Sequence, residues 1–406
     1  MTDRVRSMHV ATSQGYAGTL VKDGQHVFTY DIGSVDPVRP ERAISLSMPP
    51  RAASWKTTPM LPVFQTFLPE GFLKEHIRAR FGKVMRIDDM ALLAFSGDNA
   101  IGRIRVARDK PDGVRKPQGA FESLAEILAD QGSRDLFEYL CDKYLISTSI
   151  AGVQPKVVVR VADALPEPGA ATSIGERATL RGRQLIVKVD SAAYPDLAEN
   201  EYHCLSIARS CPSLLTVPPF HLSADRRRLA IERFDISVDG SYLGFEDMVA
   251  LQGRVNDEKY EGSYEIIAAT IRNNCTPLLV AESLRRYFAS VVFAVAVRNG
   301  DAHLKNFGLL YTDPSSEDCA LSPMFDQVST TCYIARDTLA LRLARSKAWP
   351  ARKGLEGFGR THCGVSRPDL IIDEIVAAIA AYRPQGAGPG WQQHKTNLDL
   401  ASAALK

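Results

Sequence analysis

The segment Asp301-Ala302-His303-Leu304-Lys305-Asn306, followed later by Phe325-Asp326, decides the fold expected for this chain. An aspartate is followed five residues later by an asparagine, and a second aspartate comes after a predicted hairpin. That hairpin is indicated by two apolar stretches, Phe307–Tyr311 and Leu321–Phe325, on either side of the polar turn Thr312–Asp318. In phosphotransferase sites, this spacing gives a base for the attacking hydroxyl and two magnesium ligands. A kinase is therefore the first hypothesis, with Asp301 as catalytic base and Asn306 and Asp326 as metal ligands.

Electrostatics explains why a cation belongs with these side chains. A carboxylate facing a triphosphate repels each phosphate charge by about 4 kcal/mol at about 4 Å, with an effective dielectric constant near 20. Divalent cations must lie between them. Amide and carboxylate oxygens suit the hard Mg²⁺ ion, whose coordination is completed by water and phosphate oxygens. The sequence thus predicts ATP and Mg²⁺ as cofactors.

Composition sets the broad class of protein. The chain has 406 residues, 45% of them hydrophobic, which is enough for two or three structural units. Its formal net charge of +2 gives no overall basicity that would favour nucleic acid or an acidic membrane. The seven cysteines are scattered without any C-x-x-C pair, and no apolar run is long enough to span a bilayer. We therefore expect a cytoplasmic protein with no membrane association.

Three units are expected along the chain: an N-terminal mixed α/β subdomain at 1–112, a small lobe at 113–233 and a mainly helical large lobe at 234–406. Gly18–Tyr30 predicts a hairpin closed by an Asp-Gly turn, and Val63–Phe81 a helix that Pro69 and Gly71 divide. The second unit has the order helix, strand, strand, helix, strand, as in a kinase small lobe. The expected ranges are Phe121–Leu128, Val157–Val161, Leu185–Val189, Glu199–Arg209 and Leu229–Ile231. Pro277–Arg298 and Pro368–Tyr382 are the clearest helices of the third unit.

Lys188 is a charged residue inside the apolar strand Leu185–Val189. Burying an ammonium is costly unless it is paired, so a phosphate-binding lysine here requires a carboxylate partner. Glu201 in the following helix is the natural candidate for this structural ion pair, and Glu199 competes with it. The alternative is that Lys188 faces solvent from an edge strand.

Two further segments have weaker signals. Segment 147–156 enters a strand where a phosphate-covering loop would lie, but it matches neither common glycine-rich pattern, so a plain turn is an equal alternative. Glu232-Arg233-Phe234 lies where a connector between lobes would bind adenine through its backbone. A structural ion pair is the alternative role for Glu232 and Arg233. His303 is expected to be a structural hydrogen-bonding residue, because Asp301 already fills the position of the base.

Taken together, these motifs resemble the HipA toxins. The resemblance runs from Leu68-Pro69-Glu70 almost to the end of the chain, and its motifs are highly specific when they occur in order. Besides the segments above they are Ser149–Lys156, Asn200-Glu201-Tyr202, Glu246-Asp247-Met248, Lys259-Tyr260 and Pro323–Asp326. HipA toxins are serine/threonine kinases of bacterial toxin-antitoxin modules. The resemblance implies an α+β, bilobed protein-kinase-like (phosphoinositide-kinase-like) fold with the three units given above.

The resemblance also assigns roles to individual residues. It makes Asp301 and Lys188 catalytic, Asn306 and Asp326 metal ligands, and Ser149 the autophosphorylated residue, with Ser147 and Thr148 as alternatives. The remaining ATP-binding residues are Ala151, Gly152, Val153, Gln154, Pro155, Lys156, Glu232, Arg233, Phe234, His303, Lys305 and Phe325, together with Lys188, Asn306 and Asp326. Pro155 departs from the family pattern and removes a backbone donor from the loop. A phosphate on Ser149 would repel the ATP phosphates and switch the enzyme off.

Partners are likewise implied by the resemblance. A HipB-like helix-turn-helix antitoxin would contact the N-terminal unit and link the chain indirectly to DNA, and the substrate would be an aminoacyl-tRNA synthetase. Two other functions stay open. One is a small-molecule kinase of the aminoglycoside phosphotransferase type, although Asn299 replaces the histidine of that family's motif. The other is a catalytically inactive corepressor, against which the intact acidic residues and Lys188 argue.

Overall fold

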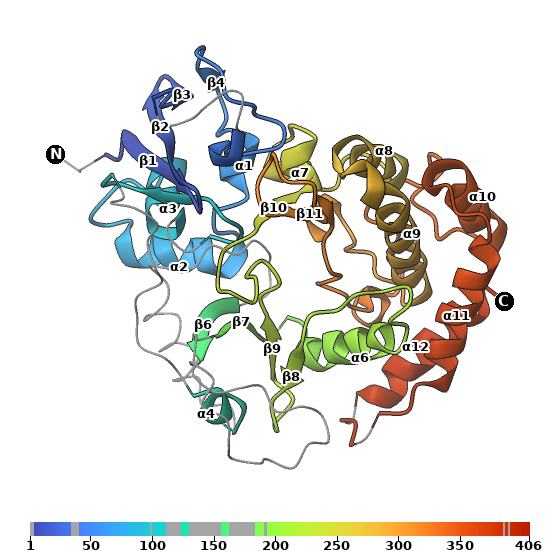
Figure 1. The fold of residues 1–406 in the computed structure, drawn as a ribbon. Helices are drawn as coiled ribbons and strands as arrows, with labels where there is room; N and C mark the ends of the chain where they lie inside the picture. Colours follow the sequence, from blue (N-terminus) through green and yellow to red (C-terminus); the bar gives the residue numbers. More distant parts are fainter. Residues whose placement is uncertain are drawn as a thin grey trace.

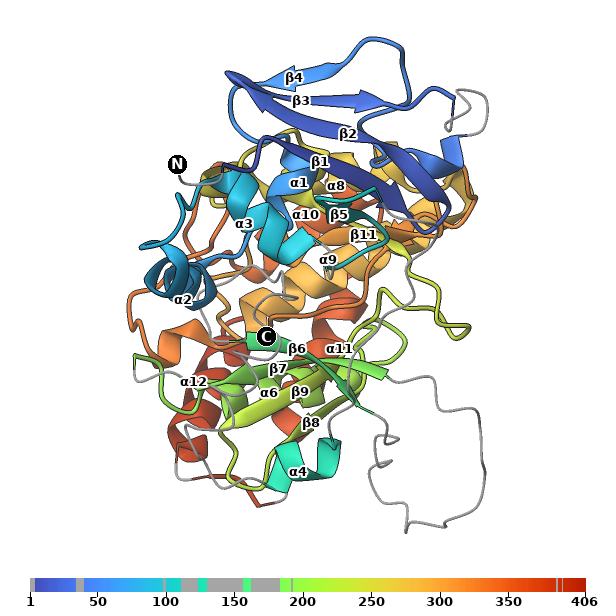
Figure 2. The same ribbon diagram turned by 90° about the vertical axis from the view of Figure 1, so that its left-hand side faces the viewer.

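The computed structural model of the chain describes residues 4–33, 40–97, 100–110, 123–129, 156–161, 183–190, 193–384, 386–388 and 390–406. Its described strands form three sheets, of five, four and three strands. The first two sheets lie at opposite ends of the molecule, and the third lies between them (Figures 1 and 2). None of the described helices combines the length and the apolar character needed to cross a membrane.

The N-terminal unit is an antiparallel sheet in the order β4-β3-β2-β1-β5, packed against three helices. The predicted hairpin is confirmed: Gly24, with φ of 68°, closes the turn between β2 and β3. The predicted helix is divided at Pro69 and Gly71, where Gly71 has φ of 51°. The elements are β1 Ser7–Thr12, β2 Gly15–Asp23, β3 Gln25–Tyr30, β4 Trp55–Thr57, α1 Pro62–Gln65, α2 Gly71–Phe81, α3 Asp89–Ser96 and β5 Arg105–Ala107.

The small-lobe sheet has the antiparallel order β6-β7-β9-β8. Its elements are α4 Leu124–Ala129, β6 Lys156–Val161, β7 Arg183–Val189, α6 Leu197–Arg209, β8 Phe220–Leu222 and β9 Arg228–Glu232. The strands predicted from Val157, Leu185 and Leu229 are present, and β8 is an additional strand. Helix α4 packs against the apolar face of β6 and β7, and α6 packs against β8 and β9. The other face of β6 and β7 carries polar residues around Val158 and Ile186, namely Lys156, Arg160, Gln184 and Lys188.

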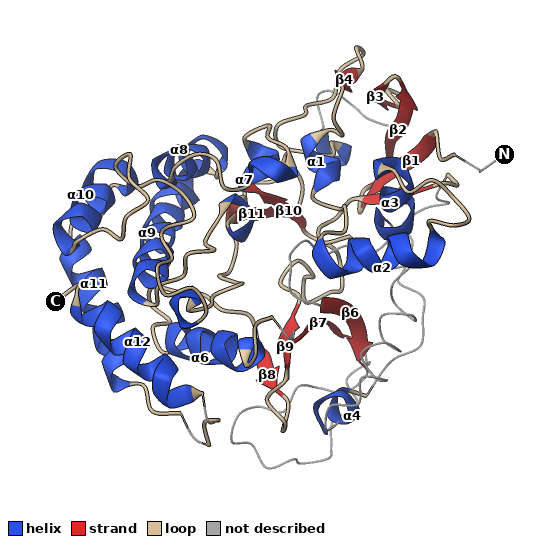
Figure 3. Ribbon diagram, turned by 180° about the vertical axis from the view of Figure 1, so that it is seen from behind, coloured by secondary structure: helices blue, strands red, loops and turns tan. Residues whose placement is uncertain are grey.

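The large lobe is mainly helical, as predicted, and its helices α8 to α12 lie on the side away from the N-terminal sheet (Figure 3). Helix α9 is buried on nearly all sides and forms the centre of the largest hydrophobic core. The elements are β10 Gly244–Asp247, α7 Met248–Leu251, α8 Tyr264–Asn274, α9 Val280–Ala296, β11 Gly308–Tyr311, β12 Ala320–Leu321, α10 Arg352–Cys363, α11 Pro368–Ala381 and α12 Trp391–Ala403.

The hairpin that precedes Asp326 differs from the prediction in its second half. Strand β12 ends at Leu321, and residues 322–325 are irregular because Met324 N–H donates to the Thr216 carbonyl, outside any sheet. The central strand of this sheet is β11, which pairs with β12 on one side and with β10, not predicted from the sequence, on the other.

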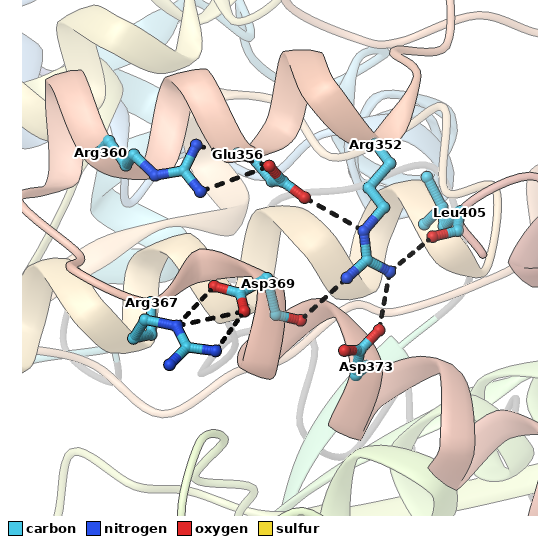
Figure 4. A network of polar contacts seen from close by, with 7 residues as sticks. All are labelled: Arg352, Glu356, Arg360, Arg367, Asp369, Asp373 and Leu405. Carbon is cyan, nitrogen blue, oxygen red and sulfur yellow. Dashed lines mark hydrogen bonds and ion pairs between the residues drawn. The ribbon is translucent and has the colours of Figure 1, made fainter.

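A polar network ties the C-terminal helices together (Figure 4). The Arg352 guanidinium on α10 donates to Glu356 on the same helix at 3.1 Å and to Asp373 on α11 at 2.7 Å. It also donates to the carbonyl of Leu405 at 3.0 Å, beyond α12. One side chain thus joins three helical segments around the large-lobe core.

Buried carboxylates join the N-terminal unit to the rest of the chain. Asp235 accepts from the Gly102 N–H at 2.5 Å and forms a buried ion pair with Arg233. Glu246 on β10 accepts from the Ser45 hydroxyl at 2.5 Å and from the Leu46 N–H at 2.8 Å. Because these acids are buried and hydrogen-bonded, the unit is fixed against the two lobes and not tethered by a linker alone.

Candidate active site

A cavity of about 440 Å³ lies between the small-lobe sheet, the loop after α9 and the segment between α1 and α2, and described residues from all three units line it. The predicted site residues within the described part of the chain all contribute to its wall. They are Lys156, Lys188, Glu201, Glu232, Arg233, Phe234, Asp301, His303, Lys305, Asn306, Phe325 and Asp326. The predicted loop residues Ala151 to Pro155 and the predicted phosphorylation site Ser149 lie outside the described residues.

Lys188 is buried at the centre of this cavity and has two carboxylate partners. Its ammonium donates to Glu201 Oε1 of α6 at 2.6 Å and also contacts Asp326 Oδ1. The competing candidate, Glu199, pairs instead with Arg226 at 2.9 Å and contacts His203. Lys188 lies opposite Leu229, on the face that α6 covers. Helix periodicity explains the choice, because Glu201 lies on the same side of α6 as Ala198 and Leu205, which pack on that face.

Lys156 lies directly opposite Lys188 on the neighbouring strand, so the ammonium groups of both lysines point into the cavity. Like charges in such a pair repel each other unless an anion lies between them. Asp326 is that anion, with Oδ2 at 3.8 Å from the Lys156 ammonium. Burial lowers the pKa of Lys156, whereas Asp326 and Glu201 raise the pKa of Lys188 against the effect of its burial. This cationic pair is suited to bind a polyphosphate.

Asp326 has an unusual backbone conformation as well as two cationic neighbours. Its φ of 51° is in the left-handed region, which costs a non-glycine residue about 1–2 kcal/mol. Although burial favours the neutral acid, Lys156 and Lys188 hold the pKa of Asp326 well below its ordinary value. The carboxylate is therefore charged at neutral pH, as a metal ligand must be.

Asn306 provides the observation that tests whether a metal ion fits here. Its side chain is buried, yet Oδ1 has no hydrogen-bond partner among the described residues. An unpaired buried amide oxygen facing a cavity that also contains the Asp326 carboxylate is an oxygen donor set of the kind Mg²⁺ prefers. The residues present thus fit the predicted ion.

Asp301 lies at the exposed side of the cavity, in the loop after α9. Its Oδ1 accepts a hydrogen bond from the Tyr260 hydroxyl at 2.6 Å, and its N–H donates to Asn299 Oδ1 at 3.1 Å. Tyr260 is itself exposed, and its ring also meets His303 edge-on, with centroids 5.0 Å apart. The carboxylate is therefore held in place while remaining accessible to an acceptor.

His303 is buried below Tyr260, and burial lowers its pKa to about 4. The imidazole is therefore neutral at pH 7, and its Nδ1 has no hydrogen-bond partner within the described part of the chain. The expected role of His303 as a structural hydrogen-bonding residue stays a prediction, because this nitrogen is unpaired among the described residues.

The other end of the cavity is apolar. The rings of Phe234, Phe245 and Phe325 meet one another with centroids 5.4 to 5.9 Å apart. Ile186 and Ile231 of the small-lobe sheet complete this wall. A flat, apolar group such as a purine base fits such a surface, and it would lie next to the cationic pair.

Arg233 and Glu232 do not pair with each other. Arg233 is buried, and its guanidinium binds Asp235, the Gln184 side chain at 2.8 Å and the Ala100 carbonyl at 3.0 Å. Glu232 pairs with Arg183 at 3.3 Å. The side chain of Arg233 therefore joins the connector to the N-terminal unit, so a contact of this residue with adenine must come from its backbone.

Sequence reasoning left several wall residues without a role. Tyr260 binds Asp301, and Glu70 of the N-terminal unit binds Lys259 and Lys305 at the floor of the site. Both occur in short motifs of the family resemblance, Lys259-Tyr260 and Leu68-Pro69-Glu70, and those motifs were the only available signal. Their partners are distant in sequence, so spacing gives no indication of the contacts.

Comparisons with known families identify the chain. A family described as the HipA-like C-terminal domain matches residues 148–382, and one described as the HipA N-terminal domain matches residues 8–107. The chain therefore belongs to the HipA family, as the sequence resemblance predicted.

Relatives and a solved structure agree with this membership. A Sinorhizobium fredii protein named "Putative kinase Y4dM" is 29% identical over 403 residues, which cover 95% of this chain and 90% of the relative. "Putative kinase Y4mE" of the same organism is 26% identical over 316 residues, covering 71% and 69%.

The solved structure is that of the Shewanella oneidensis HipA toxin-antitoxin system with HipB and operator DNA. It matches with a TM-score of 0.65 at 18% identity, and covers 98% of this chain and 97% of its own. This likeness shows the fold and confirms the predicted bilobed, kinase-like α+β architecture.

Proposed function

We propose that this chain is an ATP- and Mg²⁺-dependent serine/threonine protein kinase that acts as the toxin of a toxin-antitoxin module. The single observation that carries the proposal is the convergence of Lys188, Asp326, Asn306 and Asp301 on one cavity, with Glu201 neutralising Lys188 from below. Family membership and relatives named as kinases support the same conclusion.

The proposed reaction assigns each described residue one task. The oxygen of an acceptor hydroxyl attacks the γ-phosphorus, its proton passes to Asp301, and the bond between the γ-phosphorus and the ADP oxygen breaks. Lys156 and Lys188 bind the phosphates from the small-lobe sheet. Asn306 and Asp326 would hold Mg²⁺, which when bound neutralises the charge of the phosphate oxygens.

Adenine would bind at the connector after β9. The Glu232 N–H donates to the carbonyl of Pro219 at 2.8 Å. Opposed residues of antiparallel strands normally exchange two such bonds, but proline has no N–H to return one. Pro219 thus leaves the Glu232 carbonyl free to accept from the adenine amino group, with the three phenylalanine rings packed against the base.

The other predicted properties extend this proposal. Units at 1–112, 113–233 and 234–406 would be the N-terminal subdomain, the small lobe and the large lobe. Autophosphorylation at Ser149, a HipB-like antitoxin bound to DNA and an aminoacyl-tRNA synthetase substrate would follow from HipA membership. In the Shewanella oneidensis complex, HipA is present together with HipB and operator DNA.

A phosphate-transfer assay distinguishes this function from its alternatives. The purified chain is incubated with γ-labelled ATP, Mg²⁺ and a cell extract, with EDTA in a parallel reaction. We expect label on the chain itself or on another protein, and none with EDTA. Transfer to an aminoglycoside or a sugar but to no protein would favour the small-molecule kinase. No transfer to any acceptor would leave the inactive corepressor.

A further inference from the structure

Glu70 is the residue through which the N-terminal unit reaches the catalytic loop. It lies immediately before α2, and its carboxylate binds two lysines of the large lobe. Oε1 accepts from the Lys305 ammonium at 2.7 Å, and Oε2 accepts from the Lys259 ammonium at 3.3 Å. Although burial favours the neutral acid, the two lysines lower the pKa of Glu70, so it is charged at neutral pH.

Each of these lysines is adjacent in sequence to a residue that belongs to the proposed site or binds one of its members. Lys305 precedes Asn306, and Lys259 precedes Tyr260, whose hydroxyl binds Asp301. The two segments are also bonded directly, because the Leu304 N–H donates to the Lys259 carbonyl at 3.1 Å. One carboxylate therefore holds both Lys305, which precedes the candidate metal ligand, and the segment whose Tyr260 hydroxyl binds the candidate base.

A second contact fixes the same segment to the N-terminal unit. Asn256 accepts from the Lys305 ammonium at 3.1 Å, while its own N–H donates to Gln65 Oε1 at 2.8 Å. Its side-chain amide also donates to the Gln65 carbonyl at 2.9 Å. Lys305 thus uses two of its three ammonium hydrogens on this network and has one left for a phosphate.

We propose that Glu70 is a positioning residue for phosphate transfer, supplied to the catalytic loop by the N-terminal unit. This inference rests on the proposed kinase function. Glu70 sets the positions of Asn306 and Asp301 through their neighbours and does not touch the reacting atoms itself. The N-terminal unit is then part of the catalytic apparatus as well as a candidate surface for a partner.

Charge makes the effect of Glu70 distinguishable from a general loss of structure. Removing its negative charge leaves the ammonium groups of Lys259 and Lys305 unneutralised beside the phosphate site, so nucleotide binding should not weaken. Turnover should fall, because the loop that carries the base and a metal ligand loses its constraint. A misplacement of about 1 Å at a reacting group lowers the rate by up to about 100-fold.

The experiment compares Glu70→Gln, Glu70→Ala and Glu75→Gln with the wild-type chain. Glu75 is the matched control, because it lies on α2, which Glu70 precedes, and its carboxylate pairs with Arg78 alone among the described residues, on the exposed surface. The measurements are kcat and KM for MgATP, the dissociation constant of MgADP and the melting temperature. We expect kcat to fall about 10- to 100-fold in Glu70→Ala and less in Glu70→Gln, which keeps one oxygen that can accept from a lysine ammonium but replaces the other acceptor with an amide nitrogen. KM and MgADP affinity should stay the same or improve, and Glu75→Gln should behave like wild type.

Three results would overturn the inference. Wild-type kcat in both Glu70 variants would show that the contact does not position the loop. A lower melting temperature together with weaker MgADP binding would reduce Glu70 to a structural role. Absence of transfer by the wild-type chain itself would remove the proposed kinase function and this inference with it, and the wild-type control identifies that case separately.

Discussion

Replacing Lys188 with methionine should destabilise the chain far more than replacing its partner Glu201 with glutamine. Lys188 has two carboxylate partners, whereas Glu201 has one ion-pair partner, Lys188, among the residues that the structure describes. In Glu201→Gln, the ammonium keeps Asp326. In Lys188→Met, the completely buried Glu201 carboxylate loses its ion pair and keeps only the longer-range attraction of Lys156, and burial already raises the pKa of Glu201 with Lys188 present.

The magnitude follows from this asymmetry. Breaking a buried ion pair by removing one partner costs about 3–5 kcal/mol when the other charge is left unpaired, and Lys188→Met is such a case. Glu201→Gln keeps an oxygen that can accept from Lys188 and loses the charge of the acceptor, so it should cost less than the about 1.5–3 kcal/mol of a hydrogen bond to a charged group. The double variant should lose less than the sum of the two single variants, since it leaves no unpaired carboxylate on α6.

Urea unfolding at pH 7, followed by far-UV circular dichroism, gives the three free energies. Equal losses in the two single variants would refute the reasoning, as would strict additivity in the double variant. Either result would mean that Glu201 is not confined beside Lys188 in solution. Phosphate transfer should be lost in Lys188→Met whatever the stability measurement shows.

Two further predictions concern stability. Burial lowers the pKa of His303 to about 4 from its ordinary 6.5, so the unfolded chain binds more protons than the folded chain between these pH values. The free energy of unfolding should therefore fall by up to about 3 kcal/mol as pH decreases from 6.5 to 4. Urea titrations should show a shallower fall in His303→Gln, and an identical pH profile would contradict the burial argument. Arg352→Ala should lower the free energy of unfolding by about 1–2 kcal/mol, since its 24% exposed side chain joins α10, α11 and the Leu405 carbonyl. Arg360→Ala, whose 52% exposed side chain contacts Glu356 alone in this network, should cost less than about 0.5 kcal/mol, and equal effects would contradict this account of Figure 4.

The parts of the site that could be predicted from the sequence are those with a local signal. Lys188 is conspicuous because an ammonium inside an apolar strand requires a partner, and Glu201 follows on the next helix. The spacing from Asp301 to Asn306 and Asp326 is short enough for one loop and one hairpin to bring these residues to a common cavity. The divided helix at Pro69 and Gly71 follows from backbone chemistry alone.

The residues that sequence reasoning missed depend on distant partners. Glu70 lies 235 residues before Lys305, so no period or spacing connects the two. Strand β10 contains Glu246 and Asp247, which argue against a buried strand until their partners are known. Ser45, Leu46 and Tyr311 satisfy Glu246, and the N–H of Ala250 satisfies Asp247. Tertiary contacts thus override a local pattern that is unfavourable for a strand.

The central claim is that Asp301 receives a proton in a phosphate-transfer site formed with Asn306 and Asp326. Its most direct test is the initial rate of phosphate transfer from ATP by the Asp301→Asn variant. The control variant is Asp399→Asn, which makes the same change of charge on the exposed surface of α12, away from the cavity. The predicted result is a rate at least about 100-fold below wild type for Asp301→Asn, with an unchanged melting temperature, and a wild-type rate for Asp399→Asn. Wild-type transfer by Asp301→Asn would contradict the assignment of the base, and with it this account of the site.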